Sequence, residues 1–357
     1  MPETFLELDR VAGRYGGHIV VRNLSFSLAH GQRLALLGPP SSGKAAVLGL
    51  LAGFLKTMAG RIVLAGRDIT RLAPSARGIG LVSARDTLLP QVSLIDNVAF
   101  GLRMRGLPRA RRRHLAEEAL GRLGLEAFAA RYPRHLTALQ RRLAALARAI
   151  AIEPELLLWE EREAQPEAVR ALLRSTLAAL NLTAVLVLQD REAALAVADN
   201  VALLQAGRLQ QFGSPQEVYE SPTSRFAAEF LGRCNLMLGH LTMPGGNIGG
   251  VRLSGGTAWA RMPPNLPPGP VLVAVRPHRV RLDANGPVRG PVEHVDYLGA
   301  LTRVTVCLPE GVFVAELAAA PAGLTRGVEL GFGWAAEDAW LLAEEQEEDA
   351  AARGARA

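Results

Sequence analysis

The chain has 357 residues, of which 49% are hydrophobic, and carries a formal net charge of +6. This length suits two domains, each large enough to bury its own core. The sequence shows neither a long apolar run nor a basic, apolar leader with a cleavage site, so we expect the chain to stay in the cytoplasm. The two cysteines, Cys234 and Cys307, fit neither a disulfide framework nor a metal site.

The positive charge comes almost entirely from arginine. Of the 40 basic residues only Lys44 and Lys56 are lysines, in a chain rich in alanine and leucine. The arginines are scattered, and their one dense cluster, at 109–114, is typical of a solvated helix face, so we expect no nucleic-acid partner. Because lysine is so rare, the place of Lys44 in a glycine-containing loop indicates a chemical role.

The first part of the chain predicts short strands and a helix. Residues 18–28 alternate apolar and polar side chains like an early strand, and 33–38 read as a short buried strand. Residues 45–53 have helical spacing and end on Gly53, a favourable residue at a helix C-terminus. A further apolar strand is predicted at 77–82.

The central part predicts a helical region and more strands. Residues 93–152 are rich in Ala, Leu, Arg and Glu, and buried strands are predicted at 155–161, 183–190 and 200–209. Short apolar strands that alternate with helices indicate a largely parallel sheet, which binds its ligands at the carboxyl ends of the strands.

The character of the sequence changes near Gly232, after which Gly and Pro punctuate short Val-rich runs typical of a small all-β domain. We therefore expect three parts: a first domain at 1–235 with a helical subdomain at about 90–152, a β domain at 236–345, and a disordered tail at 346–357.

The loop between the strand at 33–38 and the helix that follows it has the pattern of a phosphate-binding loop. Gly38, Gly43 and Lys44 fit G-x-x-x-x-G-K-[ST], with Ala45 in the last place. The glycines let backbone N–H groups curl around a phosphate, the helix presents its positive end, and the lysine reaches the outer phosphates. The order strand, loop, helix is the context that this motif requires.

The order of several further segments resembles the ATP-binding subunit of ABC transporters, of the importer type. The C-terminal part is similar to the TOBE domain of the polyamine, iron and related organic-solute group. The segments that carry the resemblance are the loop at 38–45, L-T-A-L-Q at 136–140, the strand at 155–161, Q-D at 189–190, the stretch at 214–232, V-A-V-R-P-H at 273–278 and V-E-H-V-D-Y-L-G at 292–299.

This resemblance implies a P-loop NTPase (RecA-like) α/β core with a parallel sheet and a helical ABC subdomain, followed by a small all-β, OB-like TOBE domain. It implies ATP and Mg²⁺ as cofactors. The implied partners are transmembrane permease subunits, a second ABC subunit in a homodimer or heterodimer and, indirectly, a solute-binding protein. The implied location is the inner face of the cell membrane, where the subunit is peripheral.

The resemblance also assigns roles to single residues. Tyr15 matches the aromatic residue that stacks on adenine. Glu161 matches the base that orients the attacking water, Glu160 stands at the place of the aspartate that holds magnesium, and Gln189 replaces the switch histidine. The residues that match the phosphate contacts are Gly38, Ser42, Gly43, Lys44, Ala45 and Ala46.

Other positions depart from the family pattern. Ala45 lacks the hydroxyl that ligates magnesium, and Pro40 and Ser41 replace a serine and a glycine of the loop. Ala84 stands where a glutamine links metal and water to the permease. At the signature L-S-G-G-Q, Ala138 and Leu139 replace the two glycines that approach the phosphate of the opposite subunit. Since phosphoryl transfer depends on several groups acting together, we expect hydrolysis to be weak or lost and nucleotide binding to survive with a weakened Mg²⁺ site.

Two functions remain open. The first is the ATP-binding subunit of an importer for polyamine-like or related small organic solutes, which couples nucleotide binding to a permease. The second is a catalytically inactive pseudo-ATPase that acts as a regulatory or structural partner of an active ABC paralogue. The sequence also leaves open whether the C-terminal β domain senses a ligand, although Arg276 and its neighbours fit a role in shaping the β fold.

Overall fold

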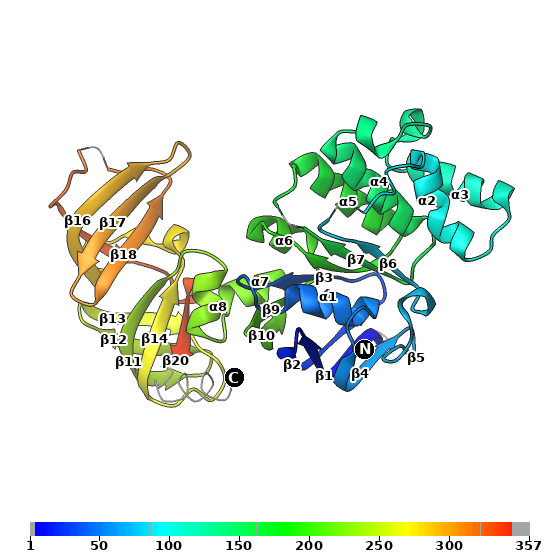
Figure 1. Ribbon diagram of the computed structural model, residues 1–357. Helices are drawn as coiled ribbons and strands as arrows, with labels where there is room; N and C mark the ends of the chain where they lie inside the picture. The colour runs from blue at the N-terminus through cyan, green and yellow to red at the C-terminus, as the bar shows by residue number, and fades with distance from the viewer. Residues whose placement is uncertain (1–3, 86, 162, 322, 345–357) are drawn as a thin grey trace. The chain divides into compact units, whose positions relative to one another are not determined.

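The computed structural model of the chain describes residues 4–85, 87–161, 163–321 and 323–344 (Figure 1). Two compact units, Met1–Pro215 and Gln216–Ala357, are described here one by one. Residues 216–235, which sequence patterns place in the first domain, group with the second unit. The expected tail at 346–357 lies outside the described residues. Among the described residues, no helix is both long and apolar enough to cross a bilayer.

A six-stranded sheet forms the centre of the first unit, in the order β10-β9-β3-β8-β7-β6. Five strands run parallel, and β10 pairs antiparallel with β9 at one edge. The central strands are short apolar runs buried on both faces, as parallel strands are, so the strands predicted from such runs are confirmed. The strands are β3 (Arg33–Leu37), β6 (Ile79–Val82), β7 (Leu156–Glu160), β8 (Thr183–Val187), β9 (Asn200–Gln205) and β10 (Arg208–Gly213).

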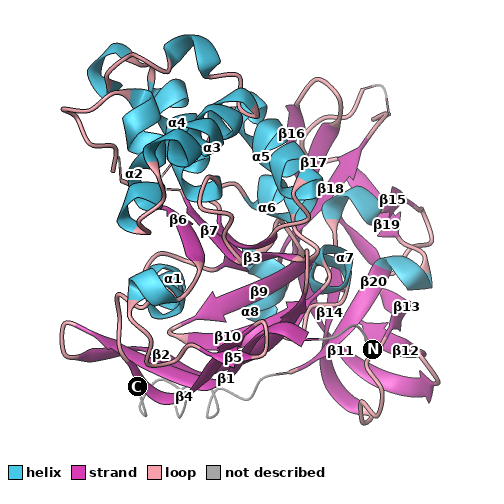
Figure 2. Ribbon diagram, turned by 90° about the vertical axis from the view of Figure 1, so that its right-hand side faces the viewer, coloured by secondary structure: helices cyan, strands magenta, loops and turns pink. Residues whose placement is uncertain are grey.

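Helices follow the strands as predicted. The expected helical region contains α2 (Leu94–Met104), α3 (Arg109–Gly121) and α4 (Ala138–Ile150), which lie together beyond the β6 edge of the sheet (Figures 1 and 2). Helix α4 begins in a capping box, in which Thr137 and Gln140 satisfy each other's backbone N–H groups. Two further helices of this unit are α5 (Glu167–Ala179) and α6 (Arg191–Val197). Short 3₁₀ helices lie at Pro74–Ala76, Glu126–Phe128 and Pro133–His135.

Helix α1 (Lys44–Ala52) lies between this sheet and a second, antiparallel sheet of order β2-β1-β4-β5 (Figure 2). Its side chains Val47, Leu48, Leu50 and Leu51 are buried and pack into one core with both sheets. A helix that is apolar on all sides is stable only in such a position. The strands of the second sheet are β1 (Thr4–Tyr15), β2 (His18–Ala29), β4 (Thr57–Leu64) and β5 (Arg67–Asp68).

A two-pronged ion pair fixes the beginning of β3. Arg33 donates from Nε to Asp199 Oδ2 at 2.9 Å and from Nη2 to Oδ1 at 2.8 Å, while its backbone N–H also binds Oδ2 at 2.8 Å. Bidentate pairs of this kind are strong and directional. Because Asp199 directly precedes β9, the pair ties two neighbouring parallel strands and holds β3, which leads into the phosphate-binding loop.

The second unit is almost entirely β, as predicted. A closed barrel of order β11-β12-β13-β20-β14 and a sheet of order β15-β19-β16-β17-β18 share one apolar core. Arg276 donates to the carbonyls of Ala228 at 2.8 Å and Tyr219 at 2.9 Å, so it fastens the helical stretch of this unit to the end of β14. The elements are α7 (Pro215–Glu220), α8 (Arg225–Phe230), β11 (Asn235–Gly245), β12 (Ile248–Leu253), β13 (Gly256–Arg261), β14 (Gly269–Val275), β15 (Arg281–Leu282), β16 (Val288–Tyr297), β17 (Thr302–Leu308), β18 (Gly311–Leu317), β19 (Glu329–Gly333) and β20 (Ala339–Ala343).

From the Arg33–Asp199 ion pair we predict a contribution to the free energy of unfolding that depends on pH. Burial acts to raise the pKa of Asp199, but the hydrogen bonds and charge of Arg33 outweigh it, and the pKa lies below the ordinary value. The contribution is therefore present above the unfolded-state pKa of about 3.9 and is lost as the pH falls through the folded-state pKa. We expect Asp199→Asn to lower the urea midpoint at pH 7, and the difference from the native chain to shrink toward pH 3.

The matched control for this measurement is Asp9→Asn, because the exposed Asp9 carboxylate contacts its neighbour Arg10 on the surface. We expect this control to leave the midpoint nearly unchanged. A difference between Asp199→Asn and the native chain that stays the same from pH 7 to pH 3 would contradict the account.

Candidate nucleotide-binding site

A cavity of about 600 Å³ opens where β3 passes into helix α1. This volume is in the usual range for small-molecule sites. The cavity brings together the predicted site residues with the exception of Gly38, whose carbonyl accepts a hydrogen bond from Lys44 Nζ. The predicted residues that line it are Tyr15, Ser42, Gly43, Lys44, Ala45, Ala46, Glu160, Glu161 and Gln189.

The loop at the cavity requires its glycines. Gly38 has φ of +150° and Gly43 has φ of +101°, both in the range that side chains disfavour. A Cβ atom at Gly38 would stand 2.2 Å from the Leu204 carbonyl oxygen, and one at Gly43 would stand 2.6 Å from that of Val20. Close packing of the loop against β9 and β2 therefore explains both glycines.

The start of α1 turns backbone donors toward the loop. Val47 is the first residue whose N–H bonds back along the helix, to Gly43 O at 3.0 Å. By helix geometry the N–H groups of residues 44–46 have no acceptor within the helix, and the helix dipole adds a partial positive charge there. This end of the cavity suits the oxygens of a phosphate.

Lys44 adds a full positive charge at the same place. Its Nζ donates to Gly38 O at 2.7 Å, to Pro39 O at 2.8 Å and to Ser42 Oγ at 3.2 Å. Burial lowers the pKa of the Lys44 ammonium. The three hydrogen bonds hold the ammonium across the loop, which places its positive charge beside the start of α1.

Apolar side chains line another part of the cavity. Tyr15, at the end of β1, is 68% exposed, so a face of its ring is open for stacking. Val20 and Leu55 also line the cavity. A wall of this kind suits a planar heterocycle such as a nucleobase.

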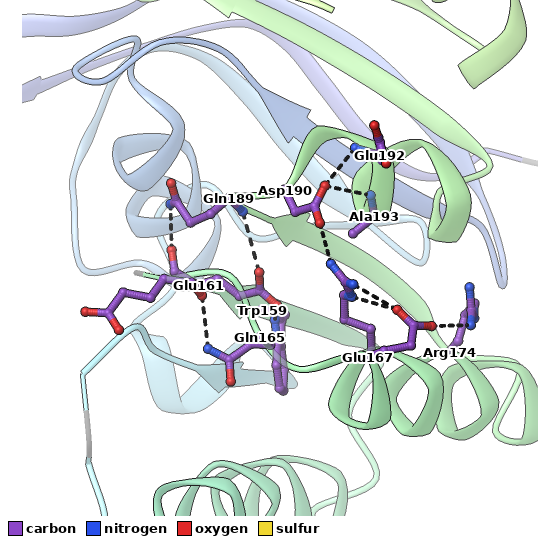
Figure 3. A network of polar contacts seen from close by, with 11 residues as sticks. Trp159, Glu161, Gln165, Glu167, Arg174, Gln189, Asp190, Glu192 and Ala193 are labelled. Atoms are coloured by element: carbon purple, nitrogen blue, oxygen red, sulfur yellow. Dashed lines mark hydrogen bonds and ion pairs between the residues drawn. The ribbon is translucent and has the colours of Figure 1, made fainter. Parts of the chain in front are cut away.

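Glu161 directly follows β7, and its carboxylate is buried at the cavity. Its side chain is 3% exposed, and its Oε1 accepts a hydrogen bond from Trp159 Nε1 at 3.1 Å (Figure 3). Burial raises the pKa of Glu161, and the hydrogen bond from Trp159 opposes this only in part. Gln189 Nε2 donates a hydrogen bond to the backbone carbonyl oxygen of Glu161 at 2.9 Å. In this arrangement Trp159 occupies an oxygen that a catalytic base would offer to water.

A network of ion pairs lies next to Gln189, between α5 and the start of α6. Asp190 caps α6 by accepting from the backbone N–H groups of Glu192 and Ala193, and it also binds Arg170 of α5 (Figure 3). Arg170 and Arg174 both contact Glu167. The network ties α5 to the start of α6 and keeps the backbone of Gln189 in place.

Sequence reasoning missed two residues that lie behind the cavity and contact its glutamates, Arg142 and Trp159. The Arg142 guanidinium donates to the carbonyls of Ser83 and Glu160 and lies 4.1 Å from the centre of the Trp159 indole. A signal was present in the sequence, because Arg142 stands on the helix face of the buried residues Ala145 and Leu146. A charged residue on an apolar helix face indicates a buried partner.

The residues present do not fit Mg²⁺. Magnesium requires several oxygen ligands, and the loop position that would supply a hydroxyl is Ala45. Ala84 offers a methyl group, and its backbone N–H donates to Glu160 Oε2 at 3.3 Å. Ser42 Oγ accepts from Lys44. Within the described residues no group of three His, Cys, Asp or Glu side chains gathers as a metal site.

At the segment L-T-A-L-Q, side chains stand where the resemblance implies bare backbone. Leu139 is 38% exposed in the first turn of α4, and Ala138 is exposed beside it. Both residues therefore add exposed side chains at the start of α4, where a glycine would add none.

The loop, α1 and the parallel sheet define the P-loop class of α/β proteins. Residues 21–164 match the ABC transporter family, and residues 273–342 match the TOBE domain. The chain belongs to the ABC transporter family and is similar to its importer ATP-binding subunits, as the sequence resemblance indicated.

The relatives and a solved structure agree with this membership. The Fe(3+) ions import ATP-binding protein FbpC of Brucella abortus (strain 2308) is 35% identical over 299 residues, covering 82% of this chain and 84% of the relative. The sulfate/thiosulfate import ATP-binding protein CysA of Nocardia farcinica is 40% identical over 235 residues, covering 64% of this chain and 71% of the relative. The structure of cbiO1 from Clostridium perfringens, part of the ABC transporter complex cbiONQ, is 25% identical with a TM-score of 0.56 and covers 60% of this chain and 90% of that one.

The buried Trp159–Glu161 contact predicts an energetic coupling. Trp159→Phe leaves the Glu161 carboxylate without its indole donor, and we expect a loss of about 1–3 kcal/mol in the free energy of unfolding. In a double-mutant cycle with Glu161→Leu, measured by urea denaturation, the double variant should lose less than the sum of the single variants. Additive losses would show that the two side chains do not support each other.

Proposed function

We propose that this protein is the ATP-binding subunit of an ABC importer, and that it holds ATP in the cavity with little or no hydrolysis. One observation supports this most: a single cavity combines the free amides at the start of α1, the Lys44 ammonium and the exposed ring of Tyr15. These groups suit triphosphate and adenine. None of them depends on the side chains that differ from the family pattern.

We attribute slow or absent hydrolysis to missing side chains at the positions that would hold the metal ion and the attacking water. Ala45 and Ala84 carry no side-chain oxygen for a metal or a water. The Glu161 carboxylate is bound to Trp159 inside the protein. Phosphoryl transfer draws its rate from positioning and charge stabilisation by groups that act as a unit, so the loss of one commonly slows the reaction a hundredfold or more.

The proposed setting is a membrane transport complex. The relatives carry names of Fe(3+) and sulfate/thiosulfate import proteins, which supports an importer. We propose permease subunits and a second ABC subunit, identical or different, as direct partners on the inner face of the membrane, and a solute-binding protein as an indirect partner. The prediction of polyamine-like solutes stays a prediction, and the names of the relatives widen the range to iron and sulfate.

Leu139 favours a second candidate function, that of an inactive partner of an active ABC paralogue. Its exposed side chain obstructs the approach of a second copy at this helix end. In a mixed dimer, the loop of this chain would meet an intact signature supplied by the other subunit. Co-purification separates the two cases: self-association supports the first function, and obligate pairing with another ABC chain supports the second.

Direct titration of the purified chain with ATP tests the proposal. We expect saturable binding, and we expect Lys44→Met to weaken it about tenfold or more because a charge-assisted contact is removed. The matched control is Lys56→Met, since Lys56 is the other lysine and is exposed. No saturable binding at millimolar ATP, or equal effects of the two substitutions, would refute the assignment of the cavity.

Steady-state ATP hydrolysis tests the loss of turnover. We expect the native chain to stay near background, with and without its permease, because the groups that position metal and water are missing. The triple variant Ala45→Thr, Leu139→Gly, Gln189→His restores three family side chains and should hydrolyse ATP measurably faster. Rapid turnover by the native chain would show that these positions are not needed.

A further inference from the structure

Arg142 does not line the cavity but lies behind its acidic end, next to Glu160. Its guanidinium bridges two backbone carbonyls, that of Ser83 just after β6 and that of Glu160 at the end of β7. The same group stacks on Trp159, whose indole N–H binds Glu161. The cation therefore contacts the Glu160 backbone and, through Trp159, lies near Glu161, and its charge acts on both carboxylates.

This cation is held firmly and stays charged. Burial lowers the pKa of Arg142, but the charges of Glu161 and Glu160 oppose this, and a guanidinium is not deprotonated in proteins. Two carbonyls and an aromatic face fix its plane. Its Nε is buried and has no hydrogen-bond partner among the described residues, so its burial is offset by charge and stacking rather than by a complete set of hydrogen bonds.

The protein offsets the carboxylates of the cavity with cations of its own. Glu160 and Glu161 line the cavity, Lys44 lies across its loop, and the Arg142 guanidinium lies behind the two glutamates. In a site without Arg142, Lys44 alone would offset two carboxylates and a triphosphate, and a bound divalent cation would have to reduce the remaining repulsion. Here the protein supplies that charge at the ends of β6 and β7, where the donor set does not fit Mg²⁺.

We propose that Arg142 serves as a permanent countercharge in place of Mg²⁺, so that this protein binds nucleoside triphosphates without a divalent cation. This inference rests on the proposed binding of ATP in this cavity. It adds that the protein recognises ATP free of Mg²⁺. Arg142 acts through the charge of the site and does not depend on hydrolysis.

The test is calorimetric titration of the full chain with ATP, once with EDTA and once with excess Mg²⁺. We expect the two dissociation constants of the native chain to agree within about threefold. Arg142→Gln should weaken binding in EDTA about tenfold or more and make Mg²⁺ favourable, because Lys44 alone then offsets the two carboxylates and the triphosphate. Arg142→Lys, which keeps the charge, should stay nearly independent of Mg²⁺.

Arg141→Gln is the matched control, since Arg141 is the next residue of α4 and binds the Leu136 carbonyl instead. It should behave like the native chain. Binding by the native chain in Mg²⁺ alone would overturn the inference and leave the proposed function intact, whereas no binding in either buffer would refute both. An Arg142→Gln effect that is equal with and without Mg²⁺ would assign Arg142 to folding only. If Arg142→Gln does not fold, the native chain and Arg142→Lys still decide the outcome.

Discussion

The burial of α1 between two sheets is the constraint on which the cavity depends. Its apolar side chains from Val47 to Ala52 pack into a core shared by both sheets, so the body of the helix is held in place. The loop before it is fixed in turn by the close approach of Gly38 and Gly43 to neighbouring backbone. A rigid helix start and a rigid loop keep the amide donors and Lys44 in one arrangement, which lowers the cost of ordering them around a ligand.

Phosphate binding and hydrolysis depend on the sequence to different degrees. Binding of a phosphate uses backbone N–H groups and one ammonium, which most substitutions in the loop leave in place. Hydrolysis needs particular oxygen and nitrogen atoms at particular positions, and the side chains of Ala45 and Ala84 do not supply them. The hydrogen bond between Glu161 and Trp159 and the position of Arg142 support the proposal that the chain binds a triphosphate without cutting it.

The strands of the parallel sheet and α1 could be predicted because their signals are local. Buried apolar runs predict β3, β7 and β8, and Gly53 ends α1 with φ of +82°. The gathering of Lys44 and Glu160 follows from the rule that ligands bind at the carboxyl ends of parallel strands. The contacts of Arg142 could not be predicted in the same way. They join side chains and carbonyls from distant segments, and the direction of a buried side chain depends on packing that no local pattern records.

The central claim is that the cavity retains a triphosphate that it does not cut. A crystal structure of the protein grown with ATP and Mg²⁺ tests this most directly. The account predicts intact ATP, with its outer phosphates at Lys44 and the amides of residues 44–46 and its base against Tyr15. ADP in the cavity, or a cavity that stays empty at saturating ATP, would contradict it.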